Sequence, residues 1–268
     1  MKVTTLGASV DGEYLKELIV ELVNQTVTKT ETRTKYRKPL ITFADAHDED
    51  FLILRRDINP RHKLPRDVLS NAMAVVSFFI PFAEEVVIAN REKESTAEEW
   101  AIAYAETNRL IGEISEMLVE ELGRVDVRAA WEPPTHLFDR TTLTATWSHK
   151  SVAKIAGLGS FGLHQMIITD AGCAGRLGSL VIEAVVTPTP KREEERCLYY
   201  VDGSCATCVK SCPNGTLTER GLDRQKCWEH ILEIDRGFSY LSDEQNLVGP
   251  FDVCGKCATG PCALKAPV

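Results

Sequence analysis

Cysteine is absent before Cys173, and eight of the nine cysteines lie between Cys197 and Cys262. The N-terminus lacks a basic region followed by an apolar segment and a small-residue cleavage site, so we expect a cytoplasmic protein. That compartment keeps thiols reduced, and a disulfide framework would more often spread across the fold that it staples. The crowding therefore indicates metal ligation.

Long apolar runs are also missing, and the run from Ala72 to Phe82 is far too short to cross a bilayer. We therefore expect no membrane partner. The formal net charge is −8, whereas proteins that bind nucleic acid through its phosphates usually carry a basic surplus. Nucleic acid is accordingly not an expected partner. Hydrophobic residues make up 44% of the chain, enough for one large domain or two smaller ones.

The hydrophobic pattern predicts a mixture of helices and strands. Helices are expected over residues 11–25, 95–122 and 148–156, the second capped by Ser95 with Glu98 three residues on. Strands are expected over residues 50–56, 73–80, 125–131, 165–169 and 177–186. A linker rich in proline and charge, residues 187–196, then precedes the jump in cysteine usage. We predict an α/β or α+β domain over residues 1–190 and a small cysteine-rich domain over residues 191–268.

The cysteine spacing resembles that of ferredoxins with two iron–sulfur clusters. One group is Cys197-x7-Cys205-x2-Cys208-x3-Cys212-Pro213, and the other is Cys227 with Cys254-x2-Cys257-x4-Cys262. In bacterial ferredoxins the cysteine before proline ligates the other cluster. This crossover rule predicts two [4Fe–4S] sites: cluster one with Cys197, Cys205, Cys208 and Cys262, and cluster two with Cys212, Cys227, Cys254 and Cys257.

Zinc is the alternative metal, because paired C-x2-C motifs also form four-cysteine zinc sites. Such a site would combine Cys205 and Cys208 with Cys254 and Cys257. The Cys212-Pro213 signature and the even division of eight thiols favour the clusters. Two features depart from the ferredoxin pattern: the x7 spacing after Cys197, and Ala263 where a proline is expected. The ninth cysteine, Cys173, stays unassigned, since isolated cysteines usually act as small hydrophobes.

A glycine-rich segment, Gly157-Leu-Gly159-Ser-Phe-Gly162, matches the G-x-G-x-x-G dinucleotide fingerprint. That fingerprint requires a strand before it and a helix after it, whereas here the predicted order is reversed. Two interpretations remain: a loop that packs tightly on its neighbours, or a pocket wall that admits a large flat cofactor.

The segment from Trp147 to Gly162, followed by the two cysteine groups, resembles epoxyqueuosine reductase and its relatives; Leu64-Pro65 and residues 103–108 also fit that family's N-terminal half. Reductive dehalogenases share the same plan. The resemblance implies an α+β chain in which a nitroreductase-like domain carries cobalamin and precedes a ferredoxin-like domain with two [4Fe–4S] clusters. In that plan the clusters pass single electrons to cobalt, and an acidic group supplies a proton.

The resemblance also implies site residues. The family's aspartate before the A-G-L-G segment is missing from Thr141 to His149, so Asp139 and His149 are the candidate proton donors; His164 is a weaker candidate. Corrinoid contacts are expected from Trp147, Ser148, Lys150, Gly157, Leu158, Gly159, Phe161, Gly162 and Arg176.

The chain ends at Val268, without room for the helical repeats of the tRNA-acting enzymes. We therefore expect reduction of an unidentified small substrate rather than queuosine chemistry, with a low-potential donor such as ferredoxin or flavodoxin. One rival is an electron donor that reduces the corrinoid of a partner protein and keeps none of its own. A second is a plain ferredoxin-type carrier. Flavin in the first domain is a further alternative.

Overall fold

The computed structural model describes residues 10–134, 138–191, 193–245 and 247–268. At its centre is a four-stranded antiparallel sheet with the strand order β1-β2-β8-β3. The strands are β1 (Leu40–Asp45), β2 (Ala74–Pro81), β8 (Gly175–Ile182) and β3 (Ala129–Trp131). Every residue of β2 is buried, as expected for a central strand covered on both faces. Three strand pairs lie outside this sheet among the described residues. Two of them are β4 (Phe138–Asp139) with β5 (Thr144–Ala145), and β6 (Gly159–Phe161) with β7 (Ile167–Thr169); the third lies in the cysteine-rich region.

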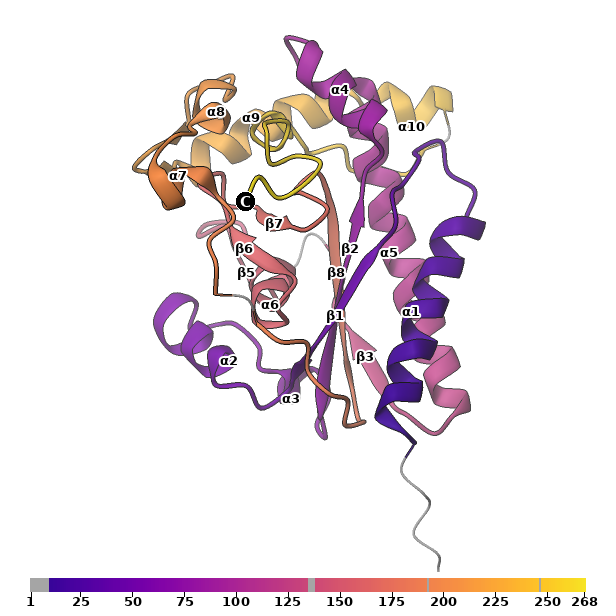
Figure 1. Ribbon diagram of the computed structural model, residues 1–268. Helices are drawn as coiled ribbons and strands as arrows, with labels where there is room; N and C mark the ends of the chain where they lie inside the picture. Colours follow the sequence, from indigo (N-terminus) through magenta and orange to yellow (C-terminus); the bar gives the residue numbers. More distant parts are fainter. Residues whose placement is uncertain (1–9, 135–137, 192, 246) are drawn as a thin grey trace, which may run out of the picture.

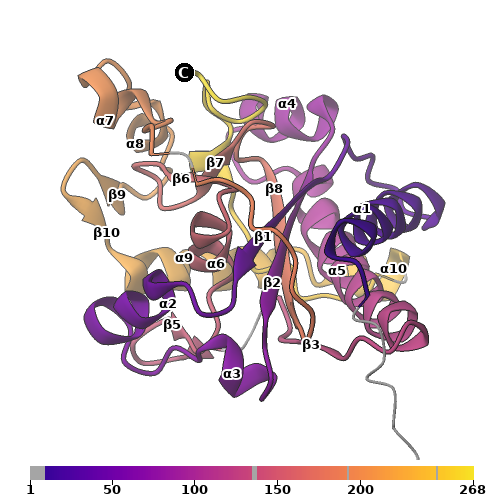
Figure 2. The same cartoon turned by 60° about the horizontal axis from the view of Figure 1, so that its bottom comes forward.

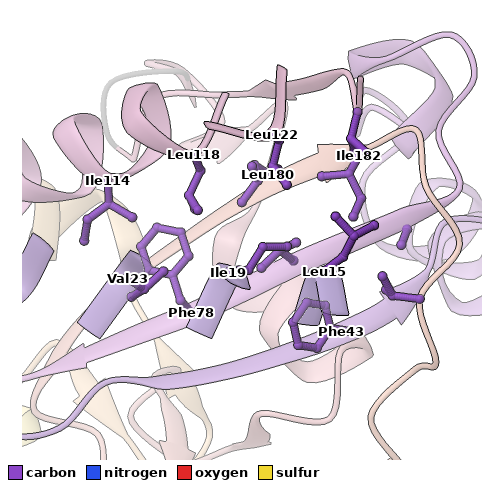
Figure 3. Packing of buried hydrophobic residues seen from close by; sticks show 14 of the residues in the cluster. Leu15, Ile19, Val23, Phe43, Phe78, Ile114, Leu118, Leu122, Leu180 and Ile182 are labelled. Atoms are coloured by element: carbon purple, nitrogen blue, oxygen red, sulfur yellow. The ribbon is translucent and has the colours of Figure 1, made fainter. Parts of the chain in front are cut away.

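Helices α1 (Gly12–Lys29) and α5 (Glu98–Arg124) cover one face of the sheet (Figure 1). The apolar stripe of α1, with Leu15, Ile19 and Val23 at helical spacing, is fully buried there. Figure 3 shows how these side chains meet residues of α5 and of the strands, namely Phe43, Phe78, Ile114, Leu118, Leu122, Leu180 and Ile182. This layer forms the largest described part of the hydrophobic core.

The opposite face carries α6 (His149–Ile155), α2 (Glu49–Ile53) and α3 (Pro65–Val68), as Figure 2 shows from below. Trp147 is buried there and stacks on both Phe51 and His62. The Ser148 side chain caps α6 by accepting a hydrogen bond from the Ser151 N–H. The residues of the glycine segment follow α6 directly, and Gly159–Phe161 forms β6.

The expected mixture of helix and sheet is confirmed, with two local corrections. Residues 50–56 form helix α2 and a π-helical turn (Leu54–Ile58) rather than a strand, because the Asp48 side chain accepts the Asp50 N–H and starts a helix. Helix α5 begins after Ala97 without a side-chain cap, so the Ser95–Glu98 capping box is wrong.

The cysteine-rich region packs against α4 (Glu84–Glu92) and α5 at one end of the sheet (Figure 1). Its elements are α7 (Leu198–Asp202), α8 (Thr207–Lys210), β9 (Leu217–Thr218), β10 (Gly221–Leu222), α9 (Arg224–Gly237), α10 (Tyr240–Gln245) and a 3-10 turn (Lys256–Ala258). Its C-terminal segment returns to the sheet, where the backbone N–H groups of Cys173 and Ala174 donate to the carbonyl of Ala263.

Arg37 fastens this return by donating to three carbonyls, those of Phe82, Ala171 and Leu264. Segments far apart in the sequence thus meet where the last cysteine lies. Within the part of the chain that the structure describes, no helix is long and apolar enough to cross a lipid bilayer.

Candidate functional site

The cysteines predicted for cluster one lie together. Cys197 precedes α7, Cys205 precedes α8, Cys208 is within α8, and Cys262 lies in the C-terminal segment. The thiol of Cys208 interacts electrostatically with the thiols of the other three, and all four line one cavity. The fold therefore brings a thiol from residue 262 to those of the first cysteine group.

The cysteines predicted for cluster two form a second group. Cys212 follows α8, Cys227 lies in α9, and Cys254 and Cys257 flank the 3-10 turn. The Cys227 thiol interacts with those of Cys254 and Cys212, and the Cys257 thiol interacts with all three. All nine cysteines are free rather than joined in disulfides.

The two groups adjoin each other, because the Cys257 thiol also interacts with that of Cys208 and lines the same cavity as cluster one. A zinc site built from the two C-x2-C motifs would require Cys254 to face Cys205 and Cys208. Cys254 instead has Cys212 as a neighbour. Cys212 is a neighbour that the crossover grouping predicts for Cys254.

Burial disfavours the charged thiolate form of these cysteines when no metal is bound. It raises the pKa of Cys257 to about 12 and that of Cys208 to about 11. For Cys212 the effect of burial is outweighed by hydrogen bonds from the Thr216 hydroxyl and the Leu217 N–H, which lower the pKa. A metal centre would supply the positive charge that buried thiolates need, so the donor set fits two iron–sulfur clusters.

Polar contacts with α4 hold the loop that carries Cys254 and Cys257. The side-chain amide of Asn90 donates to the carbonyl of Cys254 at 3.0 Å. The buried Lys256 ammonium donates to the carbonyls of Asn90 and Lys93, near the C-terminal end of α4. Gly255 has φ +70°, and a Cβ there would lie 2.1 Å from the Trp100 ring, so glycine is required.

The space beside each glycine of the segment is occupied by other atoms of the protein. A Cβ at Gly157 would lie 2.9 Å from the Pro190 carbonyl oxygen, and a Cβ at Gly159 would lie 2.2 Å from the Ile168 carbonyl oxygen. At Gly162 the neighbour is the ring of His164, at 2.8 Å. Of the two interpretations of the segment, this geometry supports the tightly packed loop.

Most other residues expected to contact a corrinoid already have protein partners. Trp147 is buried and donates to the Ser179 hydroxyl at 2.9 Å, and Leu158 is buried in the core. Lys150 donates to the Gln165 carbonyl and interacts with the thiols of Cys227 and Cys257. The Arg176 guanidinium lies 4.3 Å from the Tyr104 ring centroid, Ser148 caps α6, and Phe161 is half-buried in β6.

His149 lies within a closed hydrogen-bond network. Its Nε2 is 3.2 Å from the Pro133 carbonyl, to which only a nitrogen with a hydrogen can bond. Its Nδ1 therefore accepts from the Ser179 hydroxyl at 2.8 Å. Burial lowers the pKa of His149 to about 4, so the ring is neutral near pH 7. This geometry does not suit the expected proton donor.

We predict that this histidine makes stability pH-dependent. The unfolded chain binds a proton on His149 near pH 6.5, whereas the folded chain binds one only near pH 4. The free energy of unfolding should therefore rise between pH 4 and 6.5, by roughly 3 kcal/mol from this group. Denaturant unfolding at several pH values should show a smaller rise in His149→Gln. The exposed His47→Gln variant serves as the control, and equal rises in all three proteins would contradict the prediction.

Asp139 does not suit the proton-donor role either. It lies in β4, where its carboxylate accepts the N–H groups of Thr142 and Thr141 at 2.9 Å each and pairs with Arg61 at 2.5 Å. The two backbone hydrogen bonds and the Arg61 contact lower its pKa to about 2. A carboxyl group with that pKa has no proton to donate near neutrality.

Two groups of functional interest were missed or underweighted by sequence reasoning. Tyr104 donates to Asp252 at 2.8 Å and stacks with Arg176, which in turn donates to Asn108 at 3.0 Å. His164 lies 3.3 Å from the Cys262 thiol. In the sequence, His164 stands out only because it follows the glycine segment, in Gly162-Leu163-His164. The fold shows that the β6–β7 turn brings it beside Cys262.

No protein-family model matches the chain. Epoxyqueuosine reductase of Yersinia pestis is 33% identical over 89 residues, which cover 32% of this chain and 20% of that protein. Epoxyqueuosine reductase of Bacillus anthracis is 28% identical over 142 residues, 51% of this chain and 33% of that protein. The matched regions thus span at most a third of these curated relatives.

Solved structures of epoxyqueuosine reductases share the fold. A selenomethionine-labelled one aligns with a TM-score of 0.58 at 17% identity and covers 94% of this chain and 66% of its own. This chain resembles the epoxyqueuosine reductases. A second structure, with an epoxyqueuosine-modified tRNA stem loop, aligns with a TM-score of 0.57 at 19% identity. The resemblance recognised in the sequence is therefore confirmed, and the fold extends it over almost the whole chain.

Proposed function

We propose that the chain is an iron–sulfur oxidoreductase in which two [4Fe–4S] clusters deliver electrons to a corrinoid. The observation that carries the proposal is the division of eight cysteines into two adjoining groups of four, each assembled from segments far apart in the sequence. The same observation supports a ferredoxin-like arrangement within residues 191–268. The proposal of a nitroreductase-like region over residues 1–190 rests on the family resemblance. Similarity to epoxyqueuosine reductases supports the redox class.

In this proposal cluster one is held by Cys197, Cys205, Cys208 and Cys262, and cluster two by Cys212, Cys227, Cys254 and Cys257. The clusters would accept single electrons from a donor such as ferredoxin or flavodoxin. The protein's own contribution is to hold the ligand loops and to offset charge. The Lys150 ammonium lies near two thiols of cluster two, where its positive charge opposes the negative charge of an iron–thiolate centre.

The acceptor is either a corrinoid bound by this chain or one bound by a partner protein. The packed glycine segment and the protein-bound side chains of Trp147, Lys150 and Arg176 favour the second arrangement, because the residues expected to contact a corrinoid do not fit that role. In the partner arrangement the chain would have no substrate of its own. A small substrate remains the proposal for the first arrangement.

One structural neighbour was solved together with RNA, which bears on the choice of substrate. The solved epoxyqueuosine reductase with a bound tRNA stem loop weakens the expectation, drawn from the net charge of −8, that nucleic acid is not a partner. The proposed role in electron delivery to a corrinoid does not depend on that choice.

An anaerobic cobalamin titration of the iron-reconstituted chain, followed by gel filtration and visible spectra, tests the proposal. About eight iron atoms per chain are expected. Stoichiometric co-elution of cobalamin would establish a corrinoid-dependent reductase. Full iron content without cobalamin binding, together with reduction of a corrinoid held by an added partner, would establish the electron donor. Failure to bind iron would overturn both arrangements.

A further inference from the structure

His164 lies in the turn between β6 and β7 and is 4% exposed. Its Nε2 is 3.3 Å from the Cys262 Sγ, and its Nδ1 accepts the backbone N–H of Met166 at 3.0 Å. A ring nitrogen that accepts an N–H cannot carry a hydrogen of its own. The neutral ring therefore carries its hydrogen on Nε2, which donates to the sulfur of Cys262.

The space for this ring is created by Gly162. A Cβ at residue 162 would lie 2.8 Å from the Cε1 atom of His164 and 3.2 Å from its Nδ1. The absence of a side chain at Gly162 and the Met166 N–H together fix the orientation of the imidazole. The last glycine of the G-x-G-x-x-G segment thus positions a hydrogen-bond donor.

A second buried side chain, that of Cys173, lies beside the Cys262 sulfur. The Cys173 Sγ is 3.8 Å from the Cys262 Sγ, and the Cys173 backbone N–H donates to the Cys262 carbonyl at 2.9 Å. Ligand atoms of His164, Cys173 and Cys262 all lie within 4.8 Å of one another. Both neighbours come from the region before the first cluster ligand and meet Cys262 only because the C-terminal segment returns to the sheet.

We propose that His164 is a positioning residue for cluster one, holding the Cys262 thiolate through an Nε2–H···Sγ hydrogen bond and raising the reduction potential of that cluster. This inference rests on the proposed binding of two clusters. A hydrogen bond to a ligand sulfur stabilises the extra negative charge of the reduced cluster more than that of the oxidised cluster. In the part of the chain that the structure describes, His164 makes this contact with Cys262 and with no cysteine of cluster two, so the potential of cluster two should not depend on His164.

A redox titration of the anaerobically reconstituted full chain, followed by electron paramagnetic resonance, tests this. His164→Leu removes the donor, and His164→Gln keeps an N–H at a similar distance along the side chain. Relative to wild type, we expect a negative shift of the cluster-one midpoint in His164→Leu, a smaller shift in His164→Gln, and no shift of cluster two. Equal cluster-one midpoints in the three proteins at equal iron content would overturn the inference while leaving the two-cluster proposal intact.

Metal content separates the other outcomes. Wild-type chain without iron would overturn the two-cluster proposal together with this inference. A single non-iron metal ion in wild type that is lost in His164→Leu would show that His164, Cys173 and Cys262 form a separate metal site. That result would also overturn the inference about His164.

If His164→Leu assembles no cluster, the hydrogen bond can be tested in wild-type protein labelled with ¹⁵N-histidine. Pulsed electron paramagnetic resonance of the reduced protein should then show coupling of a histidine nitrogen to cluster one. Its absence would contradict the hydrogen bond.

Discussion

Replacing Cys208 with alanine should halve the iron content of the reconstituted chain, from about eight atoms to about four. The Cys208 thiol is surrounded by those of Cys197, Cys205 and Cys262, so its loss removes one ligand of cluster one and none of cluster two. Cys227→Ala should give the same total by losing the other cluster. Iron and sulfide analysis with electron paramagnetic resonance of the reduced protein would measure both the amount and the identity of what remains.

Double variants test the crossover grouping itself. Cys208→Ala with Cys262→Ala should retain about four iron atoms, because both ligands belong to one cluster. Cys208→Ala with Cys227→Ala should retain almost none. Cys173→Ser, which changes the cysteine outside both groups, is the matched control and should retain about eight. If Cys208→Ala with Cys254→Ala lost no more metal than either single variant, the two C-x2-C motifs would share one site, as in the zinc alternative.

The cysteine groups could be anticipated from the sequence because cluster chemistry constrains spacing directly. A C-x2-C turn presents two thiols from one loop, and the Cys212-Pro213 signature predicts which ligand crosses over. The long-range contacts could not be anticipated in the same way. Arg37 meets the carbonyl of Leu264, and His164 meets Cys262, because of how the C-terminal segment returns to the sheet.

Helix α1 and strand β2 were also predictable, because their apolar residues follow the periods of a helix and a buried strand. Residues 50–56 show why some other elements could not be predicted. Phe51 and Leu54 are both buried, and a short apolar run fits either a strand or one turn of helix. The contact that decides between them is the Asp48 side chain at the Asp50 N–H.

The glycine segment shows a second limit of sequence reasoning. Glycine indicates that something approaches the backbone closely, but not whether the approaching group is a cofactor or the protein itself. At Gly157 and Gly159 the approaching groups are the carbonyls of Pro190 and Ile168. At these two positions the segment therefore packs against the backbone of the protein itself.

Gly159→Ala should destabilise the protein by about 2–4 kcal/mol. The added Cβ would lie 2.2 Å from the Ile168 carbonyl oxygen, a backbone atom that cannot move without breaking the β6–β7 pairing of Ser160 with Ile168. Denaturant unfolding under anaerobic conditions measures the loss. Gly123→Ala in helix α5 is the control, since nothing lies within 4 Å of its added Cβ and alanine favours a helix.

The same substitution should lower the occupancy of cluster one more than that of cluster two. The β6–β7 hairpin carries His164 beside Cys262, and its Ser160 hydroxyl accepts the N–H of Arg196, the residue before Cys197. Loosening the hairpin therefore disturbs two of the four cluster-one ligands. If Gly159→Ala instead left stability and iron unchanged and abolished only cobalamin binding, the glycine segment would be a corrinoid wall after all, and its packing role would be wrong.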